Sequence, residues 1–451
     1  MFPRLINFRH EDNGSILPIV ALMFLLVTVI AGSRIDFARA VNLREKLSVA
    51  LDASALSLAV ELSSSTLTDA QIASALSEVF TANFDDSTYL STALSNLSYS
   101  LNTSEGTIAI STKAAVGTSF IALGGIGPDT LTVDVNTEVA YSQYEVELAL
   151  VLDVTGSMKN DIDTLQEATE DLVDTLIPST STEDTSKVKI SIVPYSQGVN
   201  LGSYATTVSN GNSSSNCVTE RVGEAQYTDD AYNYTPDDAS AVKDTYFGGG
   251  SSSCPDSDMK LLPLTSDRDD LMDKIDDLDD GGGTAGQTGI AWGWYTLSPN
   301  WSNLWPTDSQ PSAYSDDDVL KFAVIMTDGD NNAYYDLKET QTCTQTGTSG
   351  KFGGTKTYTC TTSTKWTAYS ESEGYNNTSS TRARTLCDAM KDAGITIYGV
   401  YFGTSSSSAG AKNMSSCASS SDNFYQASSS TELISAFGNI AKTIQAIRLI
   451  K

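Results

Sequence analysis

Histidine is almost absent from this chain. Among its 451 residues the single histidine is His10, which lies in a polar segment before the first hydrophobic run. Ser-His-Asp catalysis, Cys-His catalysis and histidine-based zinc sites all need an imidazole positioned inside a folded domain. The sequence therefore disfavours these chemistries, and any bound metal is expected to have oxygen ligands.

Basic residues are also scarce. The chain has 27 Lys and Arg against 56 Asp and Glu, which gives a formal net charge of −29. Binding to a phosphate backbone requires a clustered surface of Lys and Arg. We therefore expect no nucleic-acid partner, and we interpret the acidic residues as a solvated surface that keeps the protein soluble.

No Cys-x-x-Cys pair is present, which argues against zinc and redox motifs. The six cysteines are even in number, and they predict three structural disulfides formed in an oxidising compartment. Reduced, buried thiols in a cytosolic protein are the alternative. Nearest-neighbour pairing is favoured because each pair would bracket one polar insert or connection: Cys217–Cys254, Cys343–Cys360 and Cys387–Cys417.

One uncharged run is long enough to cross a membrane. Residues 16–32 (ILPIVALMFLLVTVIAG), with Ser15 and Ser33, approach the roughly 20 residues needed to span a bilayer. We predict a transmembrane helix at 15–33, preceded by a cytoplasmic tail at 1–14. A cleaved signal peptide is the alternative, but no small-x-small cleavage site follows and the helical pattern continues.

Apolar residues recur at helical spacing after this run, which predicts that an amphipathic helix at 34–62 continues the span. The recurring residues are Leu43, Leu47, Ala50, Leu51 and Leu58. Residues 63–145 are rich in Ser and Thr with alternating apolar positions, and 106–112 and 130–140 are predicted strands. We interpret 63–145 as a small β-rich spacer module, all-β or mixed, in which no chemistry is visible.

Strand-like and helix-like segments alternate through residues 146–451. This order predicts an α/β fold with a doubly wound, mostly parallel sheet. Polar inserts are expected at 203–257 and 331–380. The predicted strands lie at 145–153, 187–194, 261–264, 321–326 and 395–402, and the predicted helices lie at 161–176, 267–278 and 431–449.

A carboxylate and two hydroxyls follow the first of these strands. Ligands gather beyond the carboxyl ends of strands in an open parallel sheet, and Asp153, Thr155 and Ser157 (DVTGS) begin at such an end. Alternation along an extended loop puts the three side chains on one side, where they could ligate a hard cation. Taken alone, the pattern is more typical of helix capping.

Two further segments favour the metal site over capping. MTDG ends another predicted strand with Asp328, and GGGT places Thr284 in a flexible loop before a helix. DVTGS, GGGT and MTDG, in this order, resemble the metal-ion-dependent adhesion site of von Willebrand factor A domains, whose fold is Rossmann-like. The resemblance implies ligation by three hydroxyls and two carboxylates, directly or through water: Thr155, Ser157, Thr284, Asp153 and Asp328.

The resemblance also implies a resident divalent cation, most typically Mg²⁺, with Mn²⁺ or Ca²⁺ as alternatives. Such a site leaves a coordination position open, which an Asp or Glu of a protein partner fills. Hydrolysis would need a base beside a bound water, and the sequence nominates none. We therefore expect a binding protein rather than an enzyme; a Mg²⁺- or Mn²⁺-dependent hydrolase is the enzymatic alternative.

A second resemblance covers both ends and much of the middle of the chain. Three stretches are similar to TadG-like proteins of the tight-adherence (Flp) pilus system: the uncharged run with the following SRIDFARAVNLREKLSVALDASALSLAVEL, the stretch LTSDRDDLMDKIDDLDDGGGTAGQTGIAWGWYTLSPNW, and the C-terminal FYQASSSTELISAFGNIAKTIQAIRLIK. This implies a role in assembly, anchoring or adhesion of such a pilus, with pilus-assembly components as partners. A pilus-independent surface adhesin is the alternative. Prepilin cleavage after Gly14 would want a Glu where Ile19 stands, so we expect a permanent anchor.

Localisation follows from the cysteines and the acidic domain. We expect a single-pass protein of the bacterial inner membrane whose C-terminal domain is periplasmic or extracellular. The positive-inside rule favours the opposite orientation, because more basic residues follow the span than precede it: Arg34, Arg39, Arg44 and Lys46 against Arg4 and Arg9.

The sequence also predicts the position of the second insert and the packing of four tryptophans. The insert at 331–380 follows Asp328 directly, so we expect it on the metal-bearing face, where it would shape the choice of partner. Four tryptophans are expected to pack a helix and its following turn rather than form a sugar-binding platform: Trp292, Trp294, Trp301 and Trp305.

Overall fold

The computed structural model describes residues 16–103, 106–125, 127–179, 183, 185–210, 216–232, 246–248, 254–349 and 355–450. The predicted tail at 1–14, with His10 and Gly14, lies outside these described residues. Two compact units make up the chain. The first consists of Met1–Ser63 and Leu67–Ser142, and the second of Ser64–Thr66 and Gln143–Lys451.

The first unit contains one long, continuous helix. Helix α2 (Leu17–Ser64) covers both the segment predicted to span a membrane and the amphipathic segment after it. Most of its apolar side chains before Gly32 are exposed, whereas one face beyond that residue is buried against the rest of the unit. The buried face contains the residues expected from the sequence: Leu43, Leu47, Ala50, Leu51 and Leu58.

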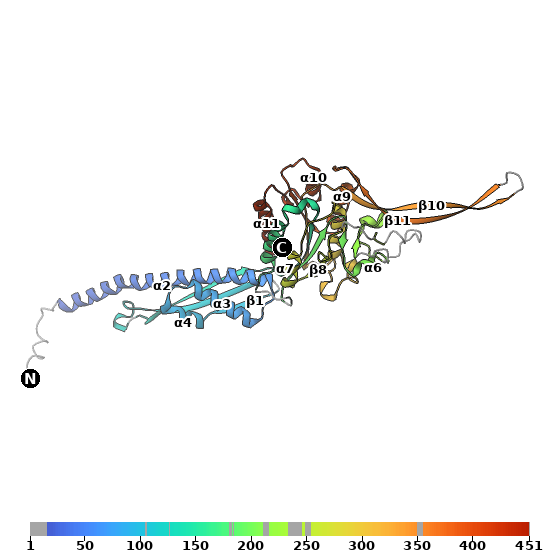
Figure 1. Ribbon diagram of the computed structural model, residues 1–451. Coiled ribbons are helices and arrows are strands. Elements are labelled where there is room, and N and C mark those ends of the chain that lie inside the picture. Colours follow the sequence, from blue (N-terminus) through green and yellow to red (C-terminus); the bar gives the residue numbers. More distant parts are fainter. Residues whose placement is uncertain are drawn as a thin grey trace, which may run out of the picture. The chain divides into compact units, whose positions relative to one another are not determined.

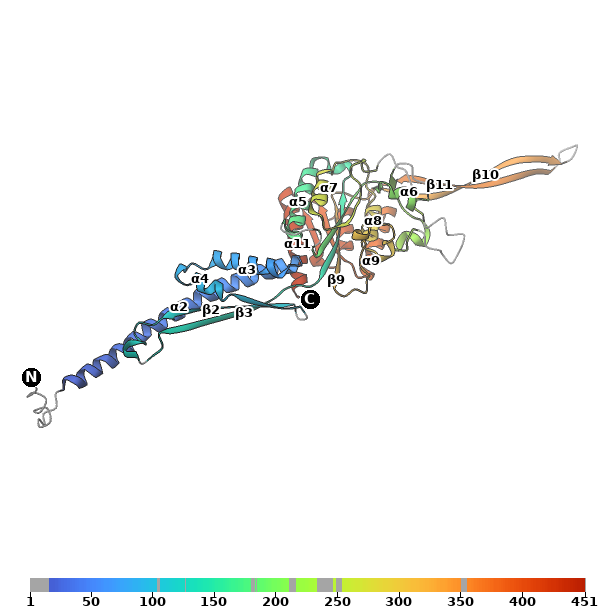
Figure 2. The same ribbon diagram turned by 90° about the horizontal axis from the view of Figure 1, so that it is seen from below.

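A three-stranded antiparallel sheet lies in the same unit, with the order β1-β2-β3. Apolar residues alternate along the central strand, and Ile108 and Ile110 contact the same core as α2. Figures 1 and 2 show the β2–β3 turn beside α2, whose N-terminal part continues past it. The strands are β1 (Ser98–Asn102), β2 (Thr107–Gly117) and β3 (Thr130–Ala140).

Two further helices in this unit show that the module expected at 63–145 is mixed rather than all-β. Helix α3 (Asp69–Asn83) begins at a capping box formed by Thr68 and Gln71, and α4 (Ser87–Ser95) begins at the cap of Asp86. The sequence contained a signal for α3, because its apolar residues are spaced four apart. These are the buried Ile72, Leu76 and Phe80.

The second unit is a mixed α/β domain built on a six-stranded sheet with the order β13-β12-β9-β4-β5-β8. Neighbouring strands are parallel throughout, except that β8 runs antiparallel to β5. The predicted, mostly parallel sheet is therefore confirmed. Its strands are β4 (Glu145–Asp153), β5 (Val188–Tyr195), β8 (Leu262–Thr265), β9 (Val319–Thr327), β12 (Thr396–Phe402) and β13 (Phe424–Ala427).

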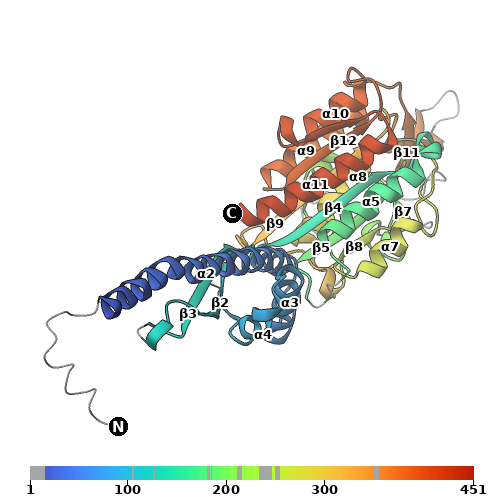
Figure 3. The same cartoon turned by 90° about the vertical axis from the view of Figure 1, so that its left-hand side faces the viewer.

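Helices cover both faces of this sheet. In β4, Leu148 and Leu150 belong to one buried cluster with side chains of α5, α7 and α11, while Ala149 and Val151 belong to another with side chains of α8, α9 and α10. A strand buried on both faces is a continuous apolar run, as in EVELALVLD. Figure 3 shows α5 and α11 side by side over one face. The helices are α5 (Ile162–Leu176), α7 (Arg268–Asp276), α8 (Gly286–Leu297), α9 (Thr378–Asp392), α10 (Ala409–Cys417) and α11 (Ser430–Ile450).

The region expected to be a polar insert at 203–257 also contributes to the core. Val208, Val218 and Phe247 are at most 1% exposed and contact the α8 face of the sheet. Isolated apolar residues in a Ser- and Asp-rich segment gave no periodic signal. Its described part contains α6 (Tyr204–Val208), β7 (Cys217–Val218) and the 3₁₀ helix η3 (Gly223–Tyr227), and β7 pairs with β6 (Val199–Asn200) just before it.

The second insert forms a long antiparallel hairpin. Strands β10 (Ala333–Ser349) and β11 (Thr355–Ser370) pair along their length, and Cys343 lies opposite Cys360. Figures 1 and 2 show the hairpin extending away from the six-stranded sheet. From Lys338 to Lys356 its described residues are exposed wherever burial is assigned. This part of the hairpin is therefore held by backbone pairing and by the Cys343–Cys360 disulfide rather than by a hydrophobic core.

All three predicted disulfides are present: Cys217–Cys254, Cys343–Cys360 and Cys387–Cys417. The four tryptophans are also packed as expected, since none is more than 4% exposed: Trp292, Trp294, Trp301 and Trp305. The indole of Trp292 meets that of Trp301 edge to face, at 5.5 Å between ring centroids. A sugar-binding platform is therefore ruled out for these four rings.

The three disulfides should contribute unequally to stability. Cys387 and Cys417 are fully buried and link α9 to the end of α10, so replacing both by Ala should lower the free energy of unfolding by about 3 kcal/mol. Replacing Cys343 and Cys360 by Ser should leave it unchanged, because the hairpin there is exposed. Urea denaturation followed by tryptophan fluorescence measures both, and equal losses would contradict this.

Candidate metal centre

Three loops meet at one edge of the six-stranded sheet. One follows β4 and contains residues 153–157, the second precedes α8 and contains 281–285, and the third follows β9 and contains 327–332. Because β4 and β9 are adjacent and parallel, their carboxyl ends open at the same edge. Backbone hydrogen bonds hold the second loop on the first: Gly156 N–H donates to Gly282 O at 3.1 Å, and Gly281 N–H donates to Val154 O at 2.9 Å.

Four of the five predicted ligands lie in one hydrogen-bonded chain. The Asp153 carboxylate accepts the Thr155 N–H at 3.0 Å, and the hydroxyls of Thr155 and Ser157 are 2.9 Å apart. The Ser157 hydroxyl in turn donates to Asp328 Oδ1 at 2.8 Å, across 171 residues of sequence. Thr284, at 4% exposure, lies in the loop held against Gly156.

This arrangement does not support the helix-capping alternative. Thr155 precedes the short 3₁₀ helix η2 (Gly156–Asn160) and Asp161 precedes α5, and neither side chain makes a capping hydrogen bond. The Asp153 carboxylate is occupied by other donors. Its oxygens and the neighbouring hydroxyls therefore form a polar cluster separate from the helix ends.

Two residues that the sequence did not nominate position Asp153. The Thr327 hydroxyl donates to Asp153 Oδ2 at 2.6 Å, and the Tyr195 hydroxyl approaches the same oxygen at 3.3 Å. Both residues end strands that flank β4. Asp153 is 0% exposed, so these donors compensate a carboxylate that has lost its water.

Two asparagines after Asp328 hold the loop that contains Thr284, and the sequence analysis did not predict this role. Asn331 Oδ1 accepts the Gly286 N–H at 2.9 Å, and Asn332 Oδ1 accepts the Thr284 N–H at 3.0 Å. A Cβ on Gly286 would stand 2.6 Å from Asn331 Oδ1, so glycine is needed for this close approach. The sequence feature that could have indicated these two asparagines is the DNN that directly follows MTDG.

Burial and repulsion both act on the two carboxyls. Burial raises the pKa of Asp153, although hydrogen bonds from Thr327, Thr155 and Tyr195 oppose the shift. Burial, followed by the nearby charge of Asp153, raises the pKa of Asp328 to about 7. A divalent cation bound by these oxygens would favour the charged forms, so the donor set fits such an ion.

The composition of the site narrows the kind of ion. In the part of the chain that the structure describes, no cluster of three or more His, Cys, Asp or Glu side chains could hold a metal. The candidate set is instead two carboxylates and three hydroxyls, and oxygen ligands suit Mg²⁺, Mn²⁺ and Ca²⁺. Asp153 and Thr155 are buried, whereas Ser157 is exposed and Asp328 half-buried, so the cluster reaches the surface.

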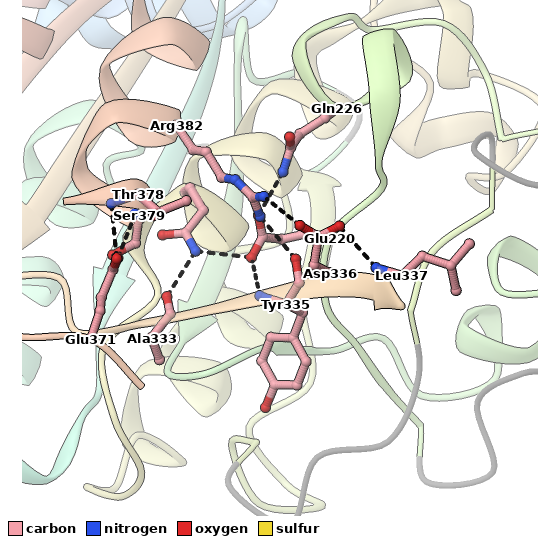
Figure 4. Close-up of polar contacts among 11 residues, drawn as sticks. Glu220, Gln226, Ala333, Tyr335, Asp336, Leu337, Glu371, Thr378, Ser379 and Arg382 are labelled. Carbon is pink, nitrogen blue, oxygen red and sulfur yellow. Dashed lines mark hydrogen bonds and ion pairs between the residues drawn. The ribbon is translucent and has the colours of Figure 1, made fainter. Parts of the chain in front are cut away.

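A second polar network lies where the two inserts meet α8 and α9 (Figure 4). The buried carboxylate of Glu220 accepts Arg382 Nη1 at 2.7 Å, the Tyr335 N–H at 2.7 Å and Gln287 Nε2 at 3.0 Å. Arg382 also donates to Tyr335 O at 2.8 Å. Burial raises the pKa of Glu220, and the Arg382 charge opposes that shift. The network anchors the base of the β10–β11 hairpin.

Comparison with known families gives a match at the N-terminus. Residues 14–60 match the Tad family model, described as "Putative Flp pilus-assembly TadE/G-like". The N-terminal segment is TadE/G-like. The predicted resemblance to TadG-like proteins is thereby confirmed for this segment. No curated protein matches the chain.

Several solved structures resemble the chain at low identity. The vWF domain of the type V pili tip protein Mfa5 from Porphyromonas gingivalis is 15% identical, with a TM-score of 0.40 over 69% of this chain and 98% of that one. The pilus adhesin SpaC from Lactobacillus rhamnosus GG is 13% identical, with a TM-score of 0.36 over 78% of this chain and 33% of that one.

A third similar structure is proximal thread matrix protein 1 from the mussel byssus, determined with a zinc-occupied MIDAS motif. It is 13% identical, with a TM-score of 0.32 over 67% of this chain and 47% of that one. This chain therefore spans nearly the whole Mfa5 domain but less than half of the SpaC and mussel chains.

The asparagine that holds the first turn of α8 offers a test of the loop arrangement. Replacing Asn331 by Ala leaves the buried Gly286 N–H without its acceptor, which should cost about 1–3 kcal/mol in the free energy of unfolding. Urea denaturation measures the loss. Asn300→Ala is the control, because Asn300 is exposed and should change stability by less than about 0.5 kcal/mol; similar losses in both variants would refute the assignment.

Proposed function

We propose that this chain is a membrane-anchored component of a tight-adherence (Flp) pilus system that binds a protein partner through a divalent cation. Residues 146–451 would be a doubly wound von Willebrand A-type domain, and the cation would be held by Asp153, Thr155, Ser157, Thr284 and Asp328. The observation that carries the binding role is the hydrogen-bonded chain from Asp153 to Asp328. The family match at residues 14–60 supports the pilus context.

Helix α2 supports the anchor. It is the one helix in the described part of the chain that is long and apolar enough to cross a membrane. Apolar side chains at its start and at the residue before it are between 50% and 78% exposed, and water contact with so many of them is unfavourable. They are Ile16, Leu17, Ile19, Val20, Leu22, Met23, Phe24, Leu26, Val27 and Ile30.

The three disulfides support a location of the second unit outside the cytoplasm. Structural disulfides persist in oxidising compartments such as the periplasm or the cell exterior, and all six cysteines are paired. We therefore assign the second unit to the periplasmic or extracellular side of a bacterial inner membrane. Residues 15–33 would span that membrane.

The net charge of the chain supports a cation-bridged contact. At −29 the chain repels an acidic partner at long range. A divalent cation at the surface-reaching cluster of Ser157 and Asp328 would supply the positive charge that an Asp or Glu of the partner needs. Mg²⁺ is the ion we propose, with Mn²⁺ or Ca²⁺ as alternatives.

We favour binding over catalysis. A hydrolase needs a base within hydrogen-bond reach of a bound water, yet the Asp153 carboxylate is already engaged by Thr327 and Tyr195 and is inaccessible. A Mg²⁺- or Mn²⁺-dependent hydrolase is the enzymatic alternative. A pilus-independent adhesin would use the same site, and the match at residues 14–60 favours the pilus role over it.

Metal affinity tests the ligand set. Asp328→Asn should weaken Mn²⁺ binding by at least about tenfold, roughly 1.4 kcal/mol, because one anionic ligand is lost. Titration calorimetry or electron paramagnetic resonance measures the affinity. Asp330→Asn is a matched control: Asp330 accepts the Gly410 N–H, a contact that Asn preserves. Equal affinities for the two variants would remove Asp328 from the site.

Partner capture tests the function itself. After crosslinking in membranes, we expect the partner to be recovered with Mg²⁺ and lost with EDTA or in Asp328→Asn, while Asp330→Asn retains it. Pilus-assembly proteins among the captured partners, identified by mass spectrometry, support the pilus role, and other surface proteins support the adhesin alternative. Equal recovery under every condition excludes metal-dependent binding.

The same assay tests the β10–β11 hairpin as a determinant of partner choice. Leu337 and Trp366 lie directly opposite each other, so residues 338–365 can be replaced by an Asn-Gly turn without touching Tyr335 or Arg382. This variant should bind Mn²⁺ normally and lose or change its partner. Unchanged recovery would show that the hairpin has no such role.

A further inference from the structure

The turn between β2 and β3 is unusually apolar for a surface turn. Residues 118–128 have the sequence TSFIALGGIGP and carry no charge. Phe120, Ile121 and Ala122 are only partly buried, and Leu123 is 36% exposed. Surface turns are usually built from polar residues, so this composition calls for a partner of apolar chemistry.

This turn is fixed to α2 where the uncharged run ends. The Phe120 ring packs on Gly32, the last residue of that run, so closely that a Cβ on Gly32 would stand 2.2 Å from the ring. The buried carboxylate of Asp36 accepts three successive backbone N–H groups of the turn, from Ser119 at 3.1 Å, Phe120 at 2.7 Å and Ile121 at 2.9 Å. These contacts set the height of the turn along the helix.

That height coincides with the exit of the proposed span from the bilayer. Gly32 and Asp36 are four residues apart, which is about 6 Å along a helix axis. Apolar side chains of α2 remain exposed here, with Ile35 at 48% and Phe37 at 65%. Figures 1 and 2 show the turn beside α2, with the start of the helix extending beyond it.

We propose that the β2–β3 turn inserts into the interfacial region of the membrane that α2 spans, and so forms a second lipid contact of the first unit. The occupant of this surface is lipid: Phe120, Ile121 and Leu123 would lie among the upper acyl chains. Arg34 and Arg39 follow the span, where long basic side chains can reach the polar headgroup region. The inference rests on the proposed membrane anchor.

Two contacts restrain the unit in a way that one helix cannot. A single span leaves the unit free to rotate and tilt on the bilayer surface, because tilt and rotation are set by packing and interfacial anchors. The turn provides such an anchor at a fixed position on one side of α2. It therefore fixes which side of the first unit faces the membrane.

Single-cysteine labelling tests the contact. All six native cysteines are disulfide-bonded, so Leu123→Cys introduces the one free thiol for an environment-sensitive fluorophore. Leu101→Cys is a matched control, since Leu101 is 37% exposed and pairs with Ile108. Ile108 is nine residues along β2 from Gly117, which is about 30 Å from the turn at the usual rise per residue.

The full chain is reconstituted in vesicles of equal parts phosphatidylcholine and phosphatidylglycerol, with and without spin-labelled lipid. The probe at position 123 should shift to the blue and be quenched by spin-labelled lipid at least about twofold more than the probe at 101, because only the interfacial region brings the lipid label into contact. Melting curves of both labelled proteins confirm that they are folded.

A third label separates this inference from the proposed anchor. Met23→Cys lies in the proposed span and is 61% exposed. Lack of quenching at 23 would overturn the anchor and the turn contact together. Quenching at 23 with equal, weak quenching at 123 and 101 would overturn the turn contact alone. A blue shift at 123 without lipid quenching would show that protein covers the turn, and would also overturn it.

Discussion

The parallel pairing of β4 with β9 is the constraint on which the candidate metal centre depends. In that register Leu152 lies beside Met326, so the next residues, Asp153 and Thr327, end their two strands side by side. Their side chains meet at 2.6 Å in a buried environment. A slip of one residue would turn each strand's side chains to the other face, and Asp328 would no longer reach Ser157.

The loops around this point are held by neutral groups rather than by charges. Asn331 and Asn332 accept N–H groups from the loop that contains Thr284, and the backbone of Gly282 accepts from Gly156. Buried charge near these loops lies instead in the Asp153 carboxylate of the candidate site and in the ion pair of Glu220 with Arg382. Breaking such a buried pair costs about 3–5 kcal/mol, so the base of the β10–β11 hairpin is held in place even though the paired strands beyond it, at 338–347 and 356–365, are largely exposed.

In the first unit, an apolar helix start that is exposed continues into a folded core. Helix α2 does so without a break, because its apolar residues surround it before Gly32 and then include one buried face beyond Asp36. Asp36 is fully buried, and its carboxylate is satisfied by backbone N–H groups of the β2–β3 turn. A single acidic side chain thus ties the sheet to the helix at the point where its environment changes.

Periodicity and composition by themselves determined much of this protein. Five of the six strands of the sheet after residue 145, the continuation of α2 and the three disulfide pairs were expected from local spacing, alternation or the positions of the cysteines. Strands β10, β11 and β13 were not expected. The five candidate ligands were expected from the resemblance of three short motifs to a metal-ion-dependent adhesion site. Helices α3 and α4, the core contribution of Phe247, and the roles of Tyr195, Thr327, Asn331 and Asn332 were not. Only the tertiary structure decided these, because a hydrogen bond between residues far apart in sequence depends on strand order and register. Neither strand order nor register can be read from the spacing of the residues that make the bond.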